Sequence, residues 1–451
     1  MLLVLITVSP TWALTNGVAL TPPMGWNSWY TFTDNINETL IRQMADAIAT
    51  NGMKETGYEY VALDDCWSLG NDESGLPIVD TSKFPSGMAA LGSYIHGKGL
   101  KFGLYTRCGE GPTHWGYRTP FGIGTNRTGY INTLASWGCD FLKVDLDPTT
   151  NSLQADFEAI SQGIVACGRP MAYSICTGWF APWMPACGNM WRTSNDWSFS
   201  NQFQVMLSIL DQNNSTAWAA GPGQWNDPDM LMVGVAPAYF LMTDTEYRAH
   251  FTMWCIVAAP LIAANDVRSM TPAIKEILTA PEVISVDQAA SGVQGTRISS
   301  VAGTGGALEV WRRPLGNNTN IQAVALLNRS TIAADITVYW TNLNLSSASA
   351  QVRDLWARTN LGTYANSYTA TVPSHGVVLV RVAGSPPLIS DIANTEGGVV
   401  IKGTDGPACS EYHVLTSTDL HLPSNLWEPT MTNRCDTKGN FSFTNALDLN
   451  A

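Results

Sequence analysis

Short apolar runs alternate with amphipathic stretches over the first 280 or so residues of the chain. The apolar runs cover residues 22–26, 58–67, 100–106, 139–147, 169–177, 189–196, 217–231 and 254–266. Between them, residues 38–53, 128–138 and 151–168 space their apolar positions as a helix does. Such runs suit strands that are covered on both faces. Eight repeats predict a (β/α)8 barrel over residues 14–282, with a doubly wound open sheet as the alternative.

The pattern changes to period-two alternation after residue 282. Residues 306–314, 321–328, 334–340 and 376–382 alternate in this way, with Gly, Asn, Ser and Thr between them. This pattern predicts a C-terminal antiparallel β-sandwich over residues 283–384. Residues 385–451 indicate a linker and a short β-rich accessory unit, to which we assign no activity.

The chain begins with an apolar run, Leu2 to Val8, followed by Pro10 and the small residue Ala13. The run is too short to cross a bilayer. We therefore expect residues 1–13 to be a secretion signal, although a tucked or disordered N-terminus is the alternative. A signal places the protein outside the cytoplasm, as a secreted, extracellular or periplasmic protein. No other segment is long and apolar enough to predict a membrane-spanning helix.

Composition narrows the class of partner. Only 14% of the 451 residues are charged, and the formal net charge is −13. This acidity argues against nucleic acids and anionic membrane surfaces as partners. The chain also has 17 Trp. Indole rings stack on the C–H faces of sugars, so the chain suits a carbohydrate partner, with a Trp-rich core as the alternative. Composition leaves the oligomeric state undetermined.

The nine cysteines are an odd number, so at least one has no partner within the chain. No C-x-x-C pair suggests a zinc site. Cys176 and Cys187 could close a short loop by a disulfide in an oxidising compartment, as could Cys409 and Cys435. Cys139 and Cys255 lie in apolar runs and are expected to be buried thiols.

Candidate catalytic residues follow from the predicted barrel, because its functional side chains project from the carboxyl ends of the strands. The polar and aromatic residues at those positions are Trp26, Asp64, Asp65, Trp67, Tyr105, Arg107, Lys143, Asp145, Asp147, Thr177, Trp191, Arg192, Asp196, Asp227 and Asp229. No histidine is among them, which argues against a His-ligated metal and against Ser-His-Asp chemistry. We expect no metal and no cofactor. Carboxylates among aromatics suit glycoside hydrolysis.

Asp145 and Asp196 are the strongest candidates among these carboxylates. Alternation puts Lys143 and Asp145 on the same side of one strand, and the lysine favours the ionised aspartate that a nucleophile requires. A structural ion pair is the alternative. Asp196 could act as acid/base, with Arg192 orienting it or the sugar, and a helix N-cap or surface aspartate is the alternative.

The remaining candidates could bind a sugar. Asp64 and Asp65 repel each other, which implies compensating donors such as sugar hydroxyls or Lys143. Asp229, in the segment Asp227–Asp229, could orient the site or simply form a turn. Trp26 and Tyr105 are either stacking walls or core aromatics.

At these residues the sequence resembles the family-27 glycoside hydrolases, the clan of α-galactosidases and α-N-acetylgalactosaminidases. The similar strings are LTPPMGWNSW (20–29), YEYVALDDCW (58–67), LKFGLYT (100–106), FLKVD (141–145), YSIC (173–176), WRTSND (191–196), GQWNDPDML (223–231) and APLIAAND (259–266). Their order matches the family across roughly residues 20–290. The β-sandwich to about residue 384 is consistent with it as well.

The resemblance implies a retaining exo-glycosidase that removes terminal α-galactosyl residues from oligosaccharides or polysaccharides. By position, Asp145 is expected to be the nucleophile and Asp196 the acid/base. Asp64 and Asp65 are expected to hold the O4 and O6 hydroxyls of a galactose-like ring. The rest of the subsite comprises Trp26, Tyr105, Lys143, Thr177, Arg192 and Asp229.

Some residues depart from the family pattern. Asp147 stands where members commonly have a cysteine that is bonded to the loop after the third strand, here Arg107–Glu110. We therefore expect an ion pair to replace that disulfide. The usual partner of Cys66 is also missing, so Cys66 is expected to be free. Thr177 is smaller than the usual residue near the sugar 2-position. This leaves α-N-acetylgalactosaminide, β-L-arabinopyranoside and α-glucan substrates as alternatives. An inactive carbohydrate-binding protein and a structural cell-surface module are the rivals from other classes.

Overall fold

The computed structural model describes residues 14, 16–111, 121–147, 153–198, 200–235, 242–316, 320–345, 347, 349–384, 388–395, 398–404, 411–417, 419, 427–436 and 440–445. The chain divides into two compact units. The first runs to Arg297 and includes Pro373–Val377, and the second contains Ile298–Val372 and the chain from Val378 onward. The expected signal, residues 1–13, lies outside the described residues.

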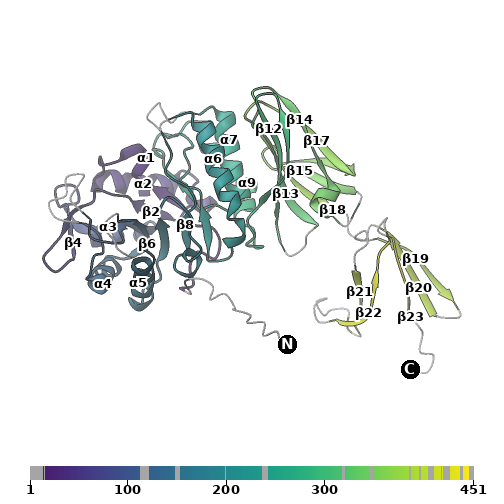
Figure 1. Cartoon of the computed structure of the whole chain (residues 1–451), viewed down its shortest axis with the longest axis horizontal. Helices are drawn as coiled ribbons and strands as arrows, with labels where there is room; N and C mark the ends of the chain where they lie inside the picture. The colour runs from purple at the N-terminus through teal and green to yellow at the C-terminus, as the bar shows by residue number, and fades with distance from the viewer. Residues whose placement is uncertain are drawn as a thin grey trace, which may run out of the picture. The chain divides into compact units, whose positions relative to one another are not determined.

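The first unit is built on eight parallel strands, one in each predicted apolar run (Figure 1). They are β1 (Met24–Asn27), β2 (Tyr60–Leu63), β5 (Lys101–Arg107), β6 (Cys139–Asp145), β7 (Ala172–Cys176), β8 (Met190–Arg192), β9 (Trp225–Asp227) and β10 (Leu261–Ala263). They pair in the order β10-β1-β2-β5-β6-β7-β8-β9. A parallel bridge between Leu231 and Ala263 joins the two ends of this order. The predicted barrel is confirmed.

Helices surround the strands, as Figure 1 shows. They are α1 (Trp29–Phe32), α2 (Glu38–Thr50), α3 (Gly87–Gly97), α4 (Arg127–Ser136), α5 (Leu153–Ala166), α6 (Gln202–Ser215), α7 (Asp244–Ile256), α8 (Pro272–Leu278) and α9 (Pro281–Asp287). A hairpin of β3 (Ser68–Asn71) and β4 (Pro77–Val79) follows β2. The predicted boundary between residues 282 and 283 falls inside α9.

Side chains that alternate along the strands fill the barrel. Tyr60, Ala62, Phe141, Met190 and Trp225 belong to one buried cluster inside it. The spacing is tight, because a Cβ on Gly25 would lie 2.6 Å from the Cβ of Tyr60. Glycine is therefore required there for the close approach of two strands. This packing leaves the carboxyl ends of the strands as the place where polar side chains converge.

The second unit contains the predicted β-sandwich. One sheet pairs in the order β11-β12-β13-β18-β15-β16, and β14 pairs with β17. Their bounds are β11 (Thr296–Gly303), β12 (Gly306–Pro314), β13 (Ile321–Asn328), β14 (Ala334–Tyr339), β15 (Ser349–Asp354), β16 (Thr359–Ala365), β17 (Ser367–Val372) and β18 (Val377–Gly384). Residues of both sheets, such as Leu326 and Val338, share one buried core. This is the packing expected of a sandwich.

The chain after the sandwich forms short strands, as the predicted β-rich unit requires. A three-stranded sheet contains β19 (Leu388–Thr395), β20 (Gly398–Thr404) and β23 (Phe441–Asn445). A separate pair contains β21 (Glu411–Thr416) and β22 (Glu428–Arg434).

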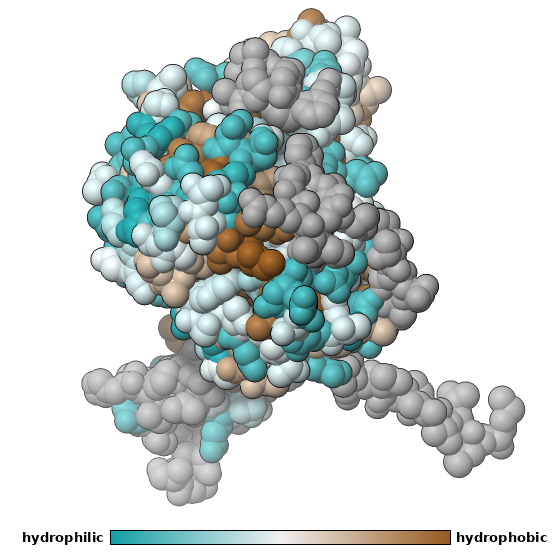
Figure 2. All heavy atoms as spheres, turned by 90° about the vertical axis from the view of Figure 1, so that its left-hand side faces the viewer, coloured by the Kyte–Doolittle hydropathy of each residue, from teal (hydrophilic) through white to brown (hydrophobic). Residues whose placement is uncertain are grey.

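Figure 2 shows one face covered mostly by hydrophilic and neutral side chains, with hydrophobic ones gathered in a hollow near its middle. Among the helices that the structure describes, none is both long and apolar enough to cross a membrane.

Candidate active site

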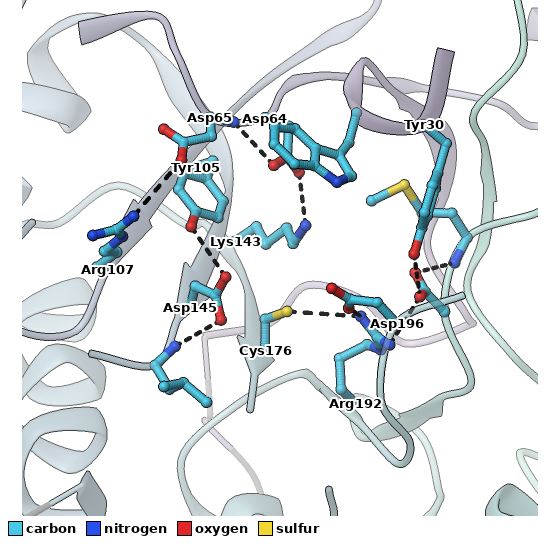
Figure 3. Close-up of a pocket in the computed structure, with 14 residues that line it drawn as sticks. Tyr30, Asp64, Asp65, Tyr105, Arg107, Lys143, Asp145, Cys176, Arg192 and Asp196 are labelled. Atoms are coloured by element: carbon cyan, nitrogen blue, oxygen red, sulfur yellow. Dashed lines mark hydrogen bonds and ion pairs between the residues drawn. The ribbon is translucent and has the colours of Figure 1, made fainter. Parts of the chain in front are cut away.

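A cavity of about 380 Å³ opens at the carboxyl ends of the barrel strands. Carboxylates, cations and aromatic rings make up most of its lining (Figure 3). The lining residues are Trp29, Tyr30, Asp64, Asp65, Tyr105, Arg107, Lys143, Asp145, Leu146, Cys176, Arg192, Asp196, Asp229 and Met230. Asp145 and Asp196 face each other across its centre in Figure 3. The two strongest candidates therefore share one cavity.

Asp145 is the last residue of β6, and its carboxyl group is held by two donors. The Tyr105 hydroxyl donates to its Oδ2 at 3.0 Å, and the backbone N–H of Leu146 donates to its Oδ1 at 2.8 Å. Burial raises the pKa of Asp145 above its ordinary value, although Lys143 acts to lower it. The two hydrogen bonds thus fix the orientation of this carboxyl in the cavity lining.

Asp196 reaches the cavity from the loop after β8. Its side chain is 71% exposed, and its Oδ1 lies 2.9 Å from Nη1 of Arg192, whose side chain is only 3% exposed. Desolvation by the cavity wall would raise the pKa of Asp196. The positive charges of Arg192 and Lys143 outweigh that effect, so the pKa falls below its ordinary value. Asp196 is the more accessible and the more readily ionised of the two carboxyls.

Arg192 connects Asp196 to a second carboxylate deeper in the wall. Its Nη2 lies 2.8 Å from Oδ2 of Asp229, and the Tyr30 hydroxyl donates to the same oxygen at 2.7 Å. Burial raises the pKa of Asp229 to about 6, against the opposing charge of Arg192. The two charged contacts and the backbone oxygen of Ser194, which accepts from Nη2 at 3.0 Å, fix the guanidinium in place.

Asp64 and Lys143 form a buried ion pair on another wall of the cavity. Nζ of Lys143 lies 2.7 Å from Oδ2 of Asp64, and Nδ2 of Asn27 donates to the same oxygen at 2.9 Å. The side chains of Asp64 and Lys143 are 3% and 13% exposed. Burial disfavours the charged lysine, but Asp64 and Asp145 more than compensate and raise the Lys143 pKa. Lys143 therefore stays charged in the cavity.

Asp65 is buried beside Asp64 and has a weaker cationic partner. Its Oδ1 accepts from the backbone N–H of Cys66 at 2.7 Å, and its Oδ2 lies 4.0 Å from Nη2 of Arg107. Burial and the charge of Asp64 raise the Asp65 pKa to about 7. A hydrogen-bond donor from a ligand would therefore stabilise the ionised form of this carboxyl.

Eight of the ten predicted catalytic and sugar-binding residues line this cavity, and Trp26 and Thr177 do not. Trp26 is fully buried and donates its Nε1–H to the backbone oxygen of Asn265 at 2.8 Å. Asn27, its neighbour on β1, reaches Asp64 instead, so alternation along the strand turns Trp26 outward. Thr177 donates its hydroxyl to the backbone oxygen of Trp179 at 2.7 Å.

Five lining residues were not predicted to line a cavity: Trp29, Tyr30, Leu146, Cys176 and Met230. Four of them follow the end of a strand, whereas the prediction rested on the strand ends themselves. Cys176 ends β7 and was predicted only as a possible disulfide partner. The sequence did contain an indication that Trp29 and Tyr30 lie near the site, because this aromatic pair follows β1 within three residues. Asp147, which was among the strand-end candidates, is buried outside the cavity and donates its N–H to Sγ of Cys108 at 3.3 Å.

The predicted disulfide between Cys176 and Cys187 is wrong, because both residues are free thiols. Cys176 lines the cavity, where Nη1 of Arg192 lies 3.8 Å from its sulfur. Cys187 lies behind the strands, where its backbone oxygen accepts from Ser161 of α5 at 2.8 Å. The Cys187 thiol donates to the backbone oxygen of Trp183 at 3.5 Å, whereas the Cys176 sulfur lies beside Arg192. Cys66, Cys139 and Cys255 are free and buried, as predicted, and Cys409 lies outside the described residues.

Fold and cavity together define a class of protein. A parallel barrel with opposed carboxylates at the carboxyl ends of its strands is the architecture of barrel glycoside hydrolases. Among the described residues, no group of three or more His, Cys, Asp and Glu side chains is arranged to hold a metal ion.

Comparison with known proteins gives the family. The family model described as alpha galactosidase A matches residues 21–289, and the alpha galactosidase C-terminal beta sandwich domain matches residues 305–382. A probable alpha-galactosidase of Dictyostelium discoideum is 38% identical over 388 residues, which cover 84% of this chain and 97% of the relative. The alpha-galactosidase of Coffea arabica is 42% identical over 369 residues, covering 80% and 93%.

Solved structures agree. Alpha-galactosidase I from Mortierella vinacea has a TM-score of 0.74 at 34% identity and covers 82% of this chain and 98% of its own. The alpha-galactosidase from Saccharomyces cerevisiae with raffinose has a TM-score of 0.73 at 25% identity and covers 82% and 99%. The chain belongs to the α-galactosidase family, the family-27 glycoside hydrolases, and is a glycoside hydrolase.

Proposed function

We propose that the protein is a retaining exo-α-galactosidase, which removes terminal α-galactosyl residues by double displacement. The observation that carries this proposal is the shared cavity of Asp145 and Asp196. The cavity volume of about 380 Å³ is near the lower end of small-molecule pockets, roughly 300–1,000 Å³. It suits a terminal sugar better than the interior of a chain. Relatives named alpha-galactosidase, one of them solved with raffinose, support the choice of sugar.

In the first step, Asp145 attacks the anomeric carbon and Asp196 protonates the departing oxygen. A galactosyl ester forms on Asp145 and the aglycone leaves as an alcohol. Burial is the main cause that raises the pKa of Asp145, and the charge of Asp196 adds to it. A bound sugar covers the exposed Asp196 and disfavours its charge. We expect this covering to favour the protonated form of Asp196, which the first step requires.

In the second step, Asp196 removes a proton from water, which attacks the anomeric carbon and releases Asp145 as a carboxylate. The ester has no charge, and Arg192 keeps the pKa of Asp196 low. Asp196 is therefore ionised when it must act as a base. Two inversions leave the product with the configuration of the substrate.

The opposite wall is suited to hold the sugar. Asp64, Asp65 and Lys143 present two acceptors and one donor within the same cavity. Hydrogen bonds between these charged groups and ring hydroxyls are stronger than neutral ones. Bonds that strengthen as the ring becomes oxocarbenium-like raise the rate and not only the affinity. The presence of Asp65 favours a ring with a CH2OH arm.

A panel of nitrophenyl glycosides tests the proposal. We expect turnover of the α-galactoside well above that of the α-N-acetylgalactosaminide, β-L-arabinopyranoside and α-glucoside. Preference for another sugar would revise the substrate, and no turnover of any would favour an inactive carbohydrate-binding protein. Asp196→Ala should lose more activity on a methyl α-galactoside than on a nitrophenyl one. Equal losses would contradict the acid/base role.

We also propose that the protein is exported, on the strength of the apolar segment at residues 1–13. N-terminal sequencing of protein recovered outside expressing cells should find a start close to residue 14. Retention in the cells with the first residues intact would contradict export.

A further inference from the structure

Asp229 has an unusual backbone conformation. Its φ is 95°, in the region that L-residues other than glycine rarely adopt. Such a residue costs about 1–3 kcal/mol and persists only where its surroundings hold it. The same residue binds Arg192, which in turn binds Asp196. The position of Asp196 therefore depends on a strained neighbour two contacts away.

Two buried tryptophans hold the backbone around Asp229. Nε1 of Trp254 donates to the backbone oxygen of Asp229 at 2.8 Å, and Nε1 of Trp197 donates to that of Met230 at 3.2 Å. The two indole rings stack with centroids 6.0 Å apart. Trp197 also donates its backbone N–H to the Tyr30 hydroxyl, the same hydroxyl that donates to Asp229.

His250, which lies on α7, supports the same segment of backbone. Its Nε2 accepts the backbone N–H of Met232 at 3.0 Å. Its ring packs edge-on against Trp254 and Trp197, with centroid distances of 4.1 Å and 5.2 Å. The residue is fully buried, and that burial lowers its pKa to about 3. It therefore remains neutral, and Nε2 keeps the lone pair that the contact requires.

A histidine at this core position lowers the stability of the folded protein. In this tautomer Nδ1 carries the proton, and within the described residues it has no hydrogen-bond partner. A buried donor without a partner costs about 1–3 kcal/mol. An apolar residue would avoid that cost but would leave the N–H of Met232 without an acceptor. The histidine thus maintains the backbone path from Asp229 to Met232 at the expense of stability.

We propose that His250 is a positioning residue for glycoside hydrolysis, which acts with Trp254 to hold Asp229 so that Arg192 keeps Asp196 over the reacting oxygen. This inference rests on the proposed function, because it assigns to Asp196 the protonation of the leaving group. A change at His250 should therefore lower kcat/KM by a factor that depends on the leaving group. A general loss of packing would not produce that dependence.

The test compares His250→Leu, which removes the acceptor, with His250→Gln, whose Oε1 can replace Nε2. Trp254→Phe removes the donor to Asp229 and keeps a ring. Trp311→Phe is the matched control, because Trp311 is another fully buried indole and donates to Glu309 at 2.9 Å in the second unit. For each variant, kcat/KM is measured on nitrophenyl and methyl α-galactosides, together with Tm.

We expect His250→Leu and Trp254→Phe to lose about tenfold more on the methyl than on the nitrophenyl galactoside. His250→Gln should recover most of this difference, and Trp311→Phe should lower Tm without it. Equal losses on both substrates in Trp254→Phe would overturn the proposal. This variant decides the test even if His250→Leu does not fold. A wild-type protein inactive on both galactosides would instead overturn the proposed function.

Discussion

Lys143 contacts Asp64, not Asp145, with 2.7 Å between Nζ and Oδ2. Alternation along β6 predicts that Lys143 and Asp145 share one side of the strand, and both do line the cavity. The lysine acts on Asp145 through space, as one of the charges that lower its pKa. Its direct contact is with the carboxylate assigned to a sugar hydroxyl. Lys143 thus links the sugar-binding wall to the proposed nucleophile.

Replacing Lys143 should therefore damage both substrate binding and folding. Lys143→Met leaves Asp64 buried without its cation, a change that typically costs about 3–5 kcal/mol. We expect chemical unfolding to show a loss of that order, and kcat/KM to fall at least ~100-fold.

Lys101→Met is the matched control for this experiment. The pair between Lys101 and Glu59 is also 2.7 Å long, but both side chains are more than 40% exposed. Its loss should cost no more than ~1 kcal/mol. Similar destabilisation in the two variants would contradict the role assigned to the buried pair.

Removing each proposed catalytic carboxyl should redirect the reaction to a small external anion. In Asp145→Gly, azide can take the place of the attacking carboxylate on an activated aryl galactoside and form the β-galactosyl azide. In Asp196→Gly, the nucleophile remains, so azide should form the α-galactosyl azide. NMR of the product distinguishes the two. An α-azide from Asp145→Gly would contradict the assignment of the nucleophile.

Asp65 should make the protein less stable as the pH rises. An aspartate in the unfolded chain titrates near pH ~4, whereas the pKa of Asp65 in the folded protein is about 7. Between these values the folded state binds more protons than the unfolded state, so stability falls with increasing pH. Asp65→Asn removes this loss. The Tm of Asp65→Asn relative to that of the wild type should increase from pH 4.5 to pH 7.5. The corresponding gain in the free energy of unfolding should be on the order of 1 kcal/mol or more.

Asp266 supplies the opposite trend as a control. Hydrogen bonding to Arg268 lowers the pKa of Asp266, so its contribution is present at neutral pH and lost on acidification. Asp266→Asn should therefore lower Tm at pH 7.5 more than at pH 3. If Asp65→Asn behaved like Asp266→Asn, the raised pKa of Asp65 would be refuted.

Trp29, not Trp26, should contact the sugar. Trp29 lines the cavity, whereas Trp26 is fully buried. We expect Trp29→Ala to raise KM for nitrophenyl α-galactoside about tenfold, because stacking and desolvation are lost. Trp26→Phe should leave KM unchanged and lower stability by about 1 kcal/mol through the lost bond to Asn265. A raised KM in Trp26→Phe and an unchanged KM in Trp29→Ala would instead make Trp26 the sugar contact.

Much of the fold and site could be predicted because strands carry strong local signals. Period-two alternation correctly placed Lys143 and Asp145 on the same side of β6, and the ends of the apolar runs located Asp64, Asp65 and Asp229. The failures have a common physical cause, which is that the sequence does not show which way a side chain faces. Trp26 and Asn27 differ by one position, and only the packing of β1 shows that Asn27 faces inward.

The cysteine prediction failed for a related reason. Cys176 and Cys187 are eleven positions apart, a spacing that a loop can close. Nearness in sequence does not bring two thiols together. Here the Cys176 sulfur lies beside Arg192, and the Cys187 thiol donates to the backbone oxygen of Trp183. The ion pair expected between Asp147 and the third-strand loop stays a prediction.

The bridge between Leu231 and Ala263, where the first and last strands of the sheet order meet, lies two residues beyond Asp229. The N–H of Leu231 donates to the backbone oxygen of Ile262 at 2.8 Å at this seam. Closing the cylinder and shaping the catalytic wall are therefore tasks of one short segment.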